Sequence, residues 1–513
     1  MVQPSSDEVQ PETEASEQNT QIIEKIHGDH KFLGHPRGTG SACALQFGTS
    51  VGNTAISSIL IYYMYAKTPT GLGMSQTDAA QIMSLYGTTL VLCGVVGGFV
   101  ADRILGPRTS VRLARLLQVI AYSLLAFPFL GIPGCMASLV LLSIAPMFVG
   151  RSLDALIGMQ YAEGDNRRSA AYTMTYVFTN IAGIFTPTIV GTMAQKIGYW
   201  SAFAFGALIA LLAWIFYVVT EKKFFGPLGV KPADPMKPAV RKKALGIMLL
   251  ILVAAVAIMA ALFITKTVTI SGFSNAVSTV AIFIPIVYFI YIVRSHKVTK
   301  DESRHVMYIL PLALCNIVAG WVWNQSITII SIYTEQSVNR NIFGFEITPA
   351  AFYTWGSICA VLFGTLFASL WTKLGTHQPS TAAKMGIGAV AWGLGPLLMI
   401  LPFLLYPAGT KVSPFWVIAF WILVMIGEAN TQPAGYTAAA DVAPKAFQAQ
   451  MMTVWNLSAG IGAALNTISI NFYHKGGEAQ YFLLIGGVTL VIGLITVIFS
   501  KKFAKGMGVL DAK

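Results

Sequence analysis

The sequence predicts an all-α protein that crosses a membrane many times, as two six-helix bundles with two extra transmembrane helices between them. Of its 513 residues, 55% are hydrophobic and 11% are charged, and the mean hydropathy is +0.64. Such a composition excludes a water-soluble domain of this length. Apolar runs recur in a six, two, six layout, and each is long enough to cross a hydrocarbon core of about 30 Å.

The elements follow this layout in order. Five acids in the first twenty positions, without the apolar segment of a signal peptide, predict a disordered cytoplasmic tail over 1–34. The first bundle is expected over 35–220, with spans near 42–65, 79–101, 111–130, 136–159, 170–196 and 199–220. A cytoplasmic loop rich in Lys and Pro and an insertion of two spans, near 244–265 and 275–294, fill residues 221–304. The second bundle is expected over 305–501, before a cytoplasmic tail at 502–513, with spans near 305–334, 348–371, 382–401, 413–438, 448–472 and 480–500.

The basic residues predict the orientation of the chain. One face, which comprises the tails and the loops after even-numbered spans, holds 27 of the 34 Lys and Arg residues. Arg151 lies inside a span, and the other face holds the remaining six, Lys67, Lys196, Lys266, Arg340, Lys411 and Lys475. Because basic loop residues concentrate in the cytoplasm, both termini are expected there. The net charge of +12 therefore indicates orientation in a membrane and not nucleic-acid binding.

The first span carries a stripe of polar residues. Gln46, Thr49, Asn53 and Ser57 recur at steps of three and four within an uncharged run, so they share one helical face. Ser50, Thr54 and Ser58 lie beside them. Such a stripe is either a packing seam between helices or the lining of a polar transport path.

Several motifs resemble the proton-coupled oligopeptide transporters, the POT family of the major facilitator superfamily. HPRG at 35–38 and ILIYY at 59–63 match the flanks of the family's first helix, and YTMTYVFTNIA at 172–182 is similar to its F-Y-x-x-I-N-x-G signature. GEANTQPAG at 427–435, AP at 443–444 and Trp455 follow another family pattern at the same spacings. The resemblance implies the major facilitator fold. The extra helix pair is found in bacterial members, which implies the bacterial plasma membrane.

A loop motif supports this assignment. GGFVADRILGPR at 97–108 resembles the superfamily signature G-x-x-x-D-R-x-x-G-x-R. The resemblance implies a structural and gating role for its central residues, whose acidic and basic side chains latch helix ends. These residues are Asp102, Arg103, Gly106 and Arg108.

The charged hallmark of the family is missing from this chain. The positions of its E-x-x-E-R-F-x-Y-Y motif fall on Gln46, Thr49, Ser50, Val51, Asn53 and Thr54. The resemblance also places Ser57, Gly150 and Asn324 where the family has an Arg, a Lys and a Glu. Stranding one member of a buried pair costs about 3–5 kcal/mol, whereas removing both is much cheaper. Both sides are absent here, which we interpret as coherent redesign of the cavity with atypical or weak proton coupling.

Three charged residues are predicted to lie well inside spans: Arg151, Asp154 and Glu428. Each costs roughly 2.5–3.5 kcal/mol at a helix centre and needs a partner or a wet cavity. Glu428 matches the acid that holds the substrate's amino terminus in the family, and a carboxylate can bind an ammonium group through charge-assisted hydrogen bonds. The alternative is a Glu that a neighbouring helix satisfies or that burial keeps protonated.

Arg151 and Asp154 are three residues apart, so they share a helical face and can pair. Two interpretations remain open. Either the pair neutralises itself and orders the helix, or Arg151 is a displaced anchor for a peptide carboxylate. A one-residue offset from the family's Lys position rotates the side chain by about 100°, which argues against a simple exchange.

Other residues are expected to supply polarity and stacking surfaces to the cavity, namely Asn53, Ser57, Tyr176, Asn180, Asn324, Gln325 and Trp455. We expect no enzyme activity, cofactor or metal. The seven histidines lie in tails and loops, the five cysteines lie in or beside apolar runs, and no phosphate-binding, zinc or nucleophile motif occurs.

These observations predict a secondary active transporter that moves di- and tripeptides or peptide-like amines by alternating access, surrounded by lipid and coupled weakly, if at all, to protons. Two alternatives remain open. One is a carrier of amines that lack a carboxylate, because Glu428 is present while the family's cationic anchors are absent. The other is a transporter-fold receptor that binds ligand without transport.

Overall fold

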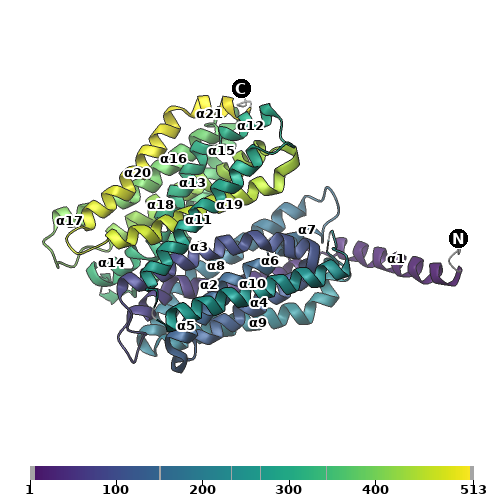
Figure 1. Ribbon diagram of the computed structural model, residues 1–513, viewed down its shortest axis with the longest axis horizontal. Coiled ribbons are helices and arrows are strands. Elements are labelled where there is room, and N and C mark those ends of the chain that lie inside the picture. Colours follow the sequence, from purple (N-terminus) through teal and green to yellow (C-terminus); the bar gives the residue numbers. More distant parts are fainter. Residues whose placement is uncertain (1–5, 150–151, 233, 266, 343, 509–513) are drawn as a thin grey trace. The chain divides into compact units, whose positions relative to one another are not determined.

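The computed structural model describes residues 6–149, 152–232, 234–265, 267–342 and 344–508. Long helices make up almost all of it (Figure 1), which confirms the predicted all-α class. Within the described residues, nine segments are long and apolar enough to cross a membrane. The first span, α2 (Arg37–Tyr65), is not one of these nine, in keeping with the many Gly, Ser and Thr residues it carries.

Contacts divide the chain into two compact units. Unit 1 comprises Met1–Ala55, Cys93–Gly183 and Trp200–Ile258, and unit 2 comprises Ile56–Leu92, Ile184–Tyr199 and Met259–Lys513. This division cuts through α2, α3 (Gln76–Val100) and α8 (Arg167–Lys196). The domain boundaries expected from the order of spans stay a prediction, and each unit is described by itself.

Unit 1 packs around the first part of α2. Leu45 on α2, Val111 on α4, Leu156 on α7 and Tyr217 on α9 belong to one buried cluster. Besides parts of α2, α3 and α8, the helices of this unit are α1 (Ser6–His27), the π-helix η1 (Ala101–Leu105), α4 (Pro107–Leu125), η2 (Pro128–Leu130), α5 (Gly131–Ile144), α6 (Pro146–Val149), α7 (Ser152–Gly158), most of α9 (Tyr199–Phe225) and most of α10 (Pro238–Ile264). Pro107 is at the start of α4, where its missing N–H leaves no hydrogen bond unmade.

Unit 2 packs around α13 (Leu310–Ile327), α16 (Thr381–Leu398), α18 (Phe415–Asp441) and α19 (Gln448–Ser469). α16 also lies close against α20 (Glu478–Ile498), because a side chain at Gly393 would meet the backbone N of Leu490 at 2.6 Å. The remaining elements are α11 (Ile270–Val293), α12 (Lys300–Met307), α14 (Ile329–Ser337), η3 (Pro349–Ala351), α15 (Phe352–Leu374), η4 (Gly375–His377), α17 (Leu401–Leu405), η5 (Lys445–Phe447), η6 (Ile470–Phe472), α21 (Ser500–Gly506) and an antiparallel strand pair, β1 (Asn341–Ile342) and β2 (Phe345–Glu346).

Two predicted spans are divided into shorter helices. In the span expected at 136–159, α5 ends at Ile144 and α6 begins at Pro146, and α7 follows after residues 150–151, which lie outside the described residues. In the span expected at 305–334, α13 ends at Ile327 and α14 begins at Ile329. Thr328, the residue between them, has a backbone conformation outside the helical region, with φ −119° and ψ −95°. The Thr328 hydroxyl donates to the carbonyl of Asn324 at 2.6 Å, a local bond that competes with the helix ladder.

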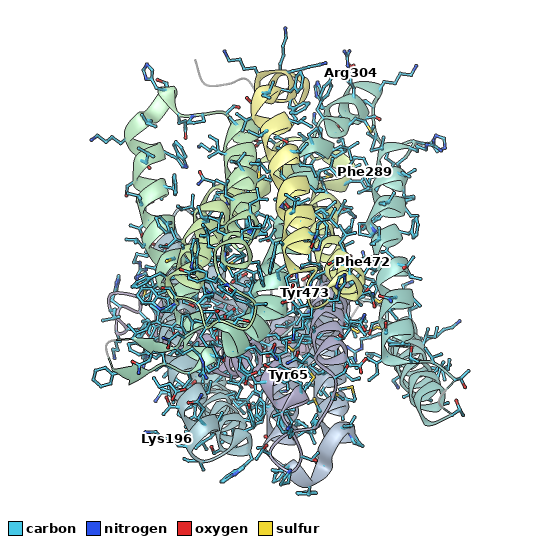
Figure 2. All side chains as sticks on the ribbon, turned by 90° about the vertical axis from the view of Figure 1, so that its left-hand side faces the viewer. Tyr65, Lys196, Phe289, Arg304, Phe472 and Tyr473 are labelled. Atoms are coloured by element: carbon cyan, nitrogen blue, oxygen red, sulfur yellow. The ribbon has the colours of Figure 1, made fainter. Side chains whose placement is uncertain are left out.

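The ends of unit 2 agree with the predicted sides of the membrane. Figure 2 shows two residues of unit 2 far apart, Arg304 on α12 near the top of the view and Lys196 at the end of α8 near the bottom. The sequence assigns these two residues to opposite membrane faces. The assignment of one face to the cytoplasm stays a prediction.

The amino-terminal segment differs from the predicted disordered tail. The structure has helix α1 over Ser6–His27 (Figure 1). Residues with high helix propensity, such as Glu and Gln, recur in this stretch, and Lys25 and His27 in its last turn suit the negative end of the helix dipole. The acidic composition, which predicted disorder, is therefore also compatible with a helix.

A polar cluster follows α1 and ties it to unit 1. The Arg167 guanidinium donates to the Asp165 carboxylate at 2.7 Å and to the carbonyl of His27 at 2.8 Å, and it lies 2.8 Å from Nδ1 of His30. His35 is buried, with its Nδ1 2.8 Å from the hydroxyl of Tyr161. Burial lowers the pKa of His35 below its ordinary value, and the positive charge of Arg167 lowers this pKa further.

Lowering the pH from 7.5 to 5.5 should loosen the segment around His35. Because the folded protein binds a proton at His35 less readily than the unfolded chain, the stability from this group is present above about pH 6.5 and is lost as the pH falls below that value. The protection factors of residues 28–37, which correct the hydrogen-exchange rates for their intrinsic pH dependence, should therefore be lower at pH 5.5. His35→Asn, which cannot titrate, should lack this difference, and an equal loss of protection in both proteins would contradict the prediction.

Candidate functional site

Unit 1 contains a cavity of about 600 Å³. Four of its lining residues come from one face of α8, and the others come from α2, α4, α6 and α7. Arg115 and Asp154 are the charged groups among the described residues that line it. The complete lining is Gln46, Arg115, Val149, Leu153, Asp154, Tyr172, Thr175, Tyr176 and Thr179.

Arg115 lies in the third turn of α4 and points its guanidinium at two neutral amides. Nη1 donates to Oε1 of Gln118 at 2.9 Å, and Nη2 donates to Oε1 of Gln46 at 3.1 Å. Nε is buried and has no acceptor among the described residues. The Nε2 of Gln46 in turn donates to the hydroxyl of Thr179 at 3.2 Å, so α2, α4 and α8 meet at this point.

The structure places the other expected residues of unit 1 in different surroundings. Asp154 and Tyr176 line the cavity. Asn53 accepts a hydrogen bond of 2.7 Å from Tyr122, and the amide of Asn180 donates to the carbonyl of Tyr176 in its own helix at 2.9 Å. The polar stripe of α2 thus serves both interpretations, with a packing contact at Asn53 and a cavity wall at Gln46. Arg151 and Gly150 lie outside the described residues.

The loop motif after α3 holds the segment that follows α9. Arg103 forms an ion pair with Asp234, and the carbonyl of Asp102 accepts from the backbone N of Asp234 at 2.9 Å. Arg108 donates to the carbonyl of Gly226 at 2.6 Å. Gly106 has a φ of 78°, and a side chain there would meet the carbonyl oxygen of Val230 at 2.7 Å. These contacts support a latching role for the motif.

In unit 2, Glu428 lies on α18 and is partly buried. Among the described residues, its carboxylate makes no ion pair and accepts no hydrogen bond. Tyr353 lies within electrostatic reach of Glu428 and beside Ser57. The ring of Tyr353 packs edge-on against Trp421 at 5.4 Å and against Trp323 at 6.5 Å. These three rings form an aromatic wall, and its Tyr353 lies within electrostatic reach of an acid that has no ion-pair partner among the described residues.

The other expected residues of unit 2 lie inside the helix packing. The amide of Gln325 is fully buried and donates to Asn466 and to the hydroxyl of Tyr481. Asn324 donates to the carbonyl of Gly320 in its own helix at 2.8 Å. Trp455 is buried in the core between α18, α19 and α13. These positions give Gln325 and Trp455 a role in holding helices together, whereas the hydrogen bond of Asn324 stays within α13.

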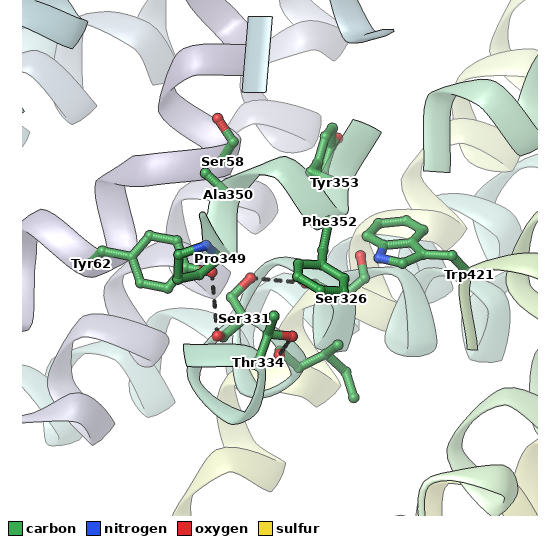
Figure 3. A pocket seen from close by; sticks show the side chains of 11 residues that line it. Ser58, Tyr62, Ser326, Ser331, Thr334, Pro349, Ala350, Phe352, Tyr353 and Trp421 are labelled. Atoms are coloured by element: carbon green, nitrogen blue, oxygen red, sulfur yellow. Dashed lines mark hydrogen bonds between the residues drawn. The ribbon is translucent and has the colours of Figure 1, made fainter. Parts of the chain in front are cut away.

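A second, very small space in unit 2 shows close packing at the end of α2 (Figure 3). Its volume is about 10 Å³, which is room for roughly one water. The hydroxyl of Tyr62 donates to the carbonyl of Ser331 at 3.2 Å, and one turn later Tyr65 donates to Glu335. α2 is therefore bonded to α14 here, with no room for a substrate.

Comparison with known proteins identifies the family. Residues 115–491, well over half of the chain, match the POT family. The chain belongs to this family. It is 30% identical to a di-/tripeptide transporter of Lactococcus lactis subsp. cremoris, over 93% of this chain and 97% of that protein.

Solved POT-family structures have the same fold. A peptide transporter POT in complex with sulfate superimposes with a TM-score of 0.91 at 30% identity, covering 95% of this chain and 99% of that one. A POT family transporter in complex with 5-aminolevulinic acid gives a TM-score of 0.87 at 30% identity, covering 93% and 99%. The predicted fold class, an all-α membrane protein of the major facilitator type, is therefore confirmed, and the family match points to a transporter.

Sequence reasoning missed Arg115 and Tyr353. Arg115 falls within the third expected span, near 111–130, but it was counted with the basic residues of the predicted cytoplasmic face and not among the charges inside spans. In the structure it lies on α4, which begins at Pro107. The signal was available, because Pro at a helix start followed by Arg108, Arg112 and Arg115 at steps of four and three predicts a basic face on a helix. For Tyr353, the sequence contains no comparable signal.

The network around Asn466 should be essential for the stability of unit 2. Asn466 is fully buried, accepts from Gln325, and donates to Ser84 at 3.0 Å. Asn466→Ala removes these bonds between helices and should lower the free energy of unfolding by about 1–3 kcal/mol. Asn430→Ala is the matched control, because Asn430 is equally buried but, among the described residues, bonds only the carbonyl of Ile426 in its own helix. Thermal unfolding in detergent measures both, and equal losses would contradict the assignment.

Proposed function

We propose that this POT-family chain is a secondary active transporter that moves di- and tripeptides or peptide-like amines by alternating access. The observation that carries the proposal is the Glu428 carboxylate, which is partly buried and has no ion-pair partner among the described residues. An acid in a membrane span that lacks a protein partner marks a substrate or ion pathway. An ammonium group is the ligand that such an acid binds best.

The surroundings of Glu428 suit a ligand that has an ammonium group and also a side chain. Tyr353, Trp323 and Trp421 form an aromatic wall, and Tyr353 lies within electrostatic reach of the acid. Aromatic faces attract a cation within about 6 Å and also bind apolar side chains without a specific hydrogen-bonding pattern. Peptides of varied sequence share one amino terminus, so this combination suits a transporter of broad selectivity.

The relatives support the same substrate class. One is named as a di-/tripeptide transporter, and another was solved with 5-aminolevulinic acid, which has an amine and a carboxylate but no peptide bond. We infer that this chain also accepts ligands with both groups. The alternatives, a carrier of amines without a carboxylate and a receptor that does not transport, are distinguished by uptake of a labelled dipeptide library and of decarboxylated analogues into liposomes.

We also propose that proton coupling is atypical. The positions of the family's charged first-helix motif are neutral here, and Gln46 and Asn324 stand where the resemblance places acids. The titratable groups that remain are Glu428 and, in the cavity of unit 1, Asp154. Proton binding at Glu428 would compete with the ammonium group of the substrate, because both need the same carboxylate oxygens.

Glu428→Gln tests the contact with the amine. Loss of a hydrogen bond to a charged partner should weaken binding of a free-amine dipeptide by about 1.5–3 kcal/mol. The N-acetylated dipeptide, which has no ammonium group, should bind equally to both proteins. Isothermal titration with both ligands gives the comparison, and unchanged affinity for the free amine would end this assignment.

Competition at Glu428 also predicts a pH dependence. The apparent affinity for a dipeptide should rise with pH as this carboxylate loses its proton, without the acid optimum of a carrier in which proton binding assists substrate entry. Counterflow in liposomes should be robust, and accumulation driven by a pH gradient should be small. Strong accumulation that survives Glu428→Gln together with Asp154→Asn would show that the proton site lies elsewhere.

A further inference from the structure

Arg115 differs from the other arginines of α4 in its partners. Arg112 donates to Glu221 at 3.0 Å, and Arg108 lies 3.8 Å from the same carboxylate. No acidic oxygen of the described residues lies within ion-pair distance of Arg115, whose hydrogen bonds go to the neutral amides of Gln46 and Gln118. Arg108 and Arg112 are thus paired with the negative charge of Glu221. The hydrogen bonds of Arg115 orient its guanidinium but come from neutral groups, which do not cancel its charge.

The cavity beside Arg115 can hold a small molecule. Its volume of about 600 Å³ falls within the range of about 300–1,000 Å³ that is typical of ligand sites. Hydroxyl groups from Thr175, Tyr176 and Thr179 contribute to the wall on α8. A cation in a membrane span that faces such a cavity is a candidate for ligand binding, because an unpaired charge in hydrocarbon is costly.

We propose that Arg115 binds the carboxylate of the transported substrate in this cavity. This inference rests on the proposed function and specifies where the anionic end of a peptide is held. The Nε of Arg115 is buried and has no acceptor among the described residues. A carboxylate that approaches the guanidinium side-on accepts from Nε with one oxygen and from an Nη with the other.

Gln46 and Gln118 act as positioning residues for this contact. Each holds one Nη of the guanidinium, at 3.1 Å and 2.9 Å respectively, which fixes the plane of the fork. Because both are neutral, they leave the positive charge available to the ligand. A carboxylate introduced at Gln46 would pair with Arg115 inside the protein and compete with the substrate. The neutral residue at position 46 is therefore a condition for carboxylate binding by Arg115.

Asp154 lines the same cavity and gives it one negative charge beside the positive one. Since Asp154 is not an acceptor of any hydrogen bond from Arg115, an incoming carboxylate does not have to displace it from the guanidinium.

The test compares the purified wild type with Arg115→Gln, Gln46→Glu and Arg112→Gln. Arg112→Gln is the matched control, because it removes an identical charge from the same helix while Glu221 keeps Arg108 as a partner. The probes are L-alanyl-L-alanine, its C-terminal amide and N-acetyl-L-alanine, and affinities are measured by titration in detergent. Wild type and Arg112→Gln should bind the dipeptide at least about tenfold more tightly than its amide.

Arg115→Gln should bind the dipeptide and its amide with similar affinities, and Gln46→Glu should lose most of the preference for the dipeptide. Preference retained in either variant would overturn the inference, so the test still decides if Arg115→Gln fails to fold. Equal binding of dipeptide and amide by the wild type would also overturn it, while leaving peptide transport intact. Binding of N-acetyl-L-alanine that depends on Arg115, without binding of any free-amine peptide, would support the carboxylate site and reject the proposed function.

Discussion

A polar or charged group inside a bilayer is tolerated only where the protein or a water-filled cavity satisfies it, and the structure depends on this constraint throughout. It makes the chain helical, since a helix pairs its own backbone groups. It also explains why Gln325, Asn466 and Tyr481 form a connected buried network and why Thr328 bonds to a carbonyl of the preceding turn. Each of these groups would otherwise be stranded away from water.

The same constraint helps to identify candidate functional groups, because charged groups with a partner inside the protein can be distinguished from charged groups without one. Arg108 and Arg112 have a partner within the protein, because both lie within ion-pair distance of Glu221. Arg115 in unit 1 is held by neutral amides, and Glu428 in unit 2 stands beside an aromatic wall. The first group is suited to an anion. The second is suited to an ammonium group, which is the contact on which the proposed function rests.

The contacts outside the cavity are of a different kind. At the end of α2, Tyr62 and Tyr65 bond to α14 and leave space for about one water. The loop motif after α3 is held by Arg103, Arg108 and the backbone of Asp102 to the segment after α9. Both sets join elements through a few polar bonds over small areas. Such contacts can be broken at modest cost, as a carrier that changes conformation requires.

The sequence by itself determined the fold class and the family, because hydrophobic runs of spanning length and motifs at fixed spacings are local features that need no knowledge of packing. It also singled out Glu428, because an acidic residue within an apolar run can be recognised from the sequence without a structure. The sequence could not show that Asn324 and Gln325 form hydrogen bonds inside the helix packing and do not face a cavity. Helical periodicity groups residues on one face, but it does not say which neighbour covers that face. Tertiary structure alone decided that Arg115 meets Gln46 across two helices and that Tyr353 stands beside Glu428. Those pairs are 69 and 75 residues apart along the chain, and only packing brings them together.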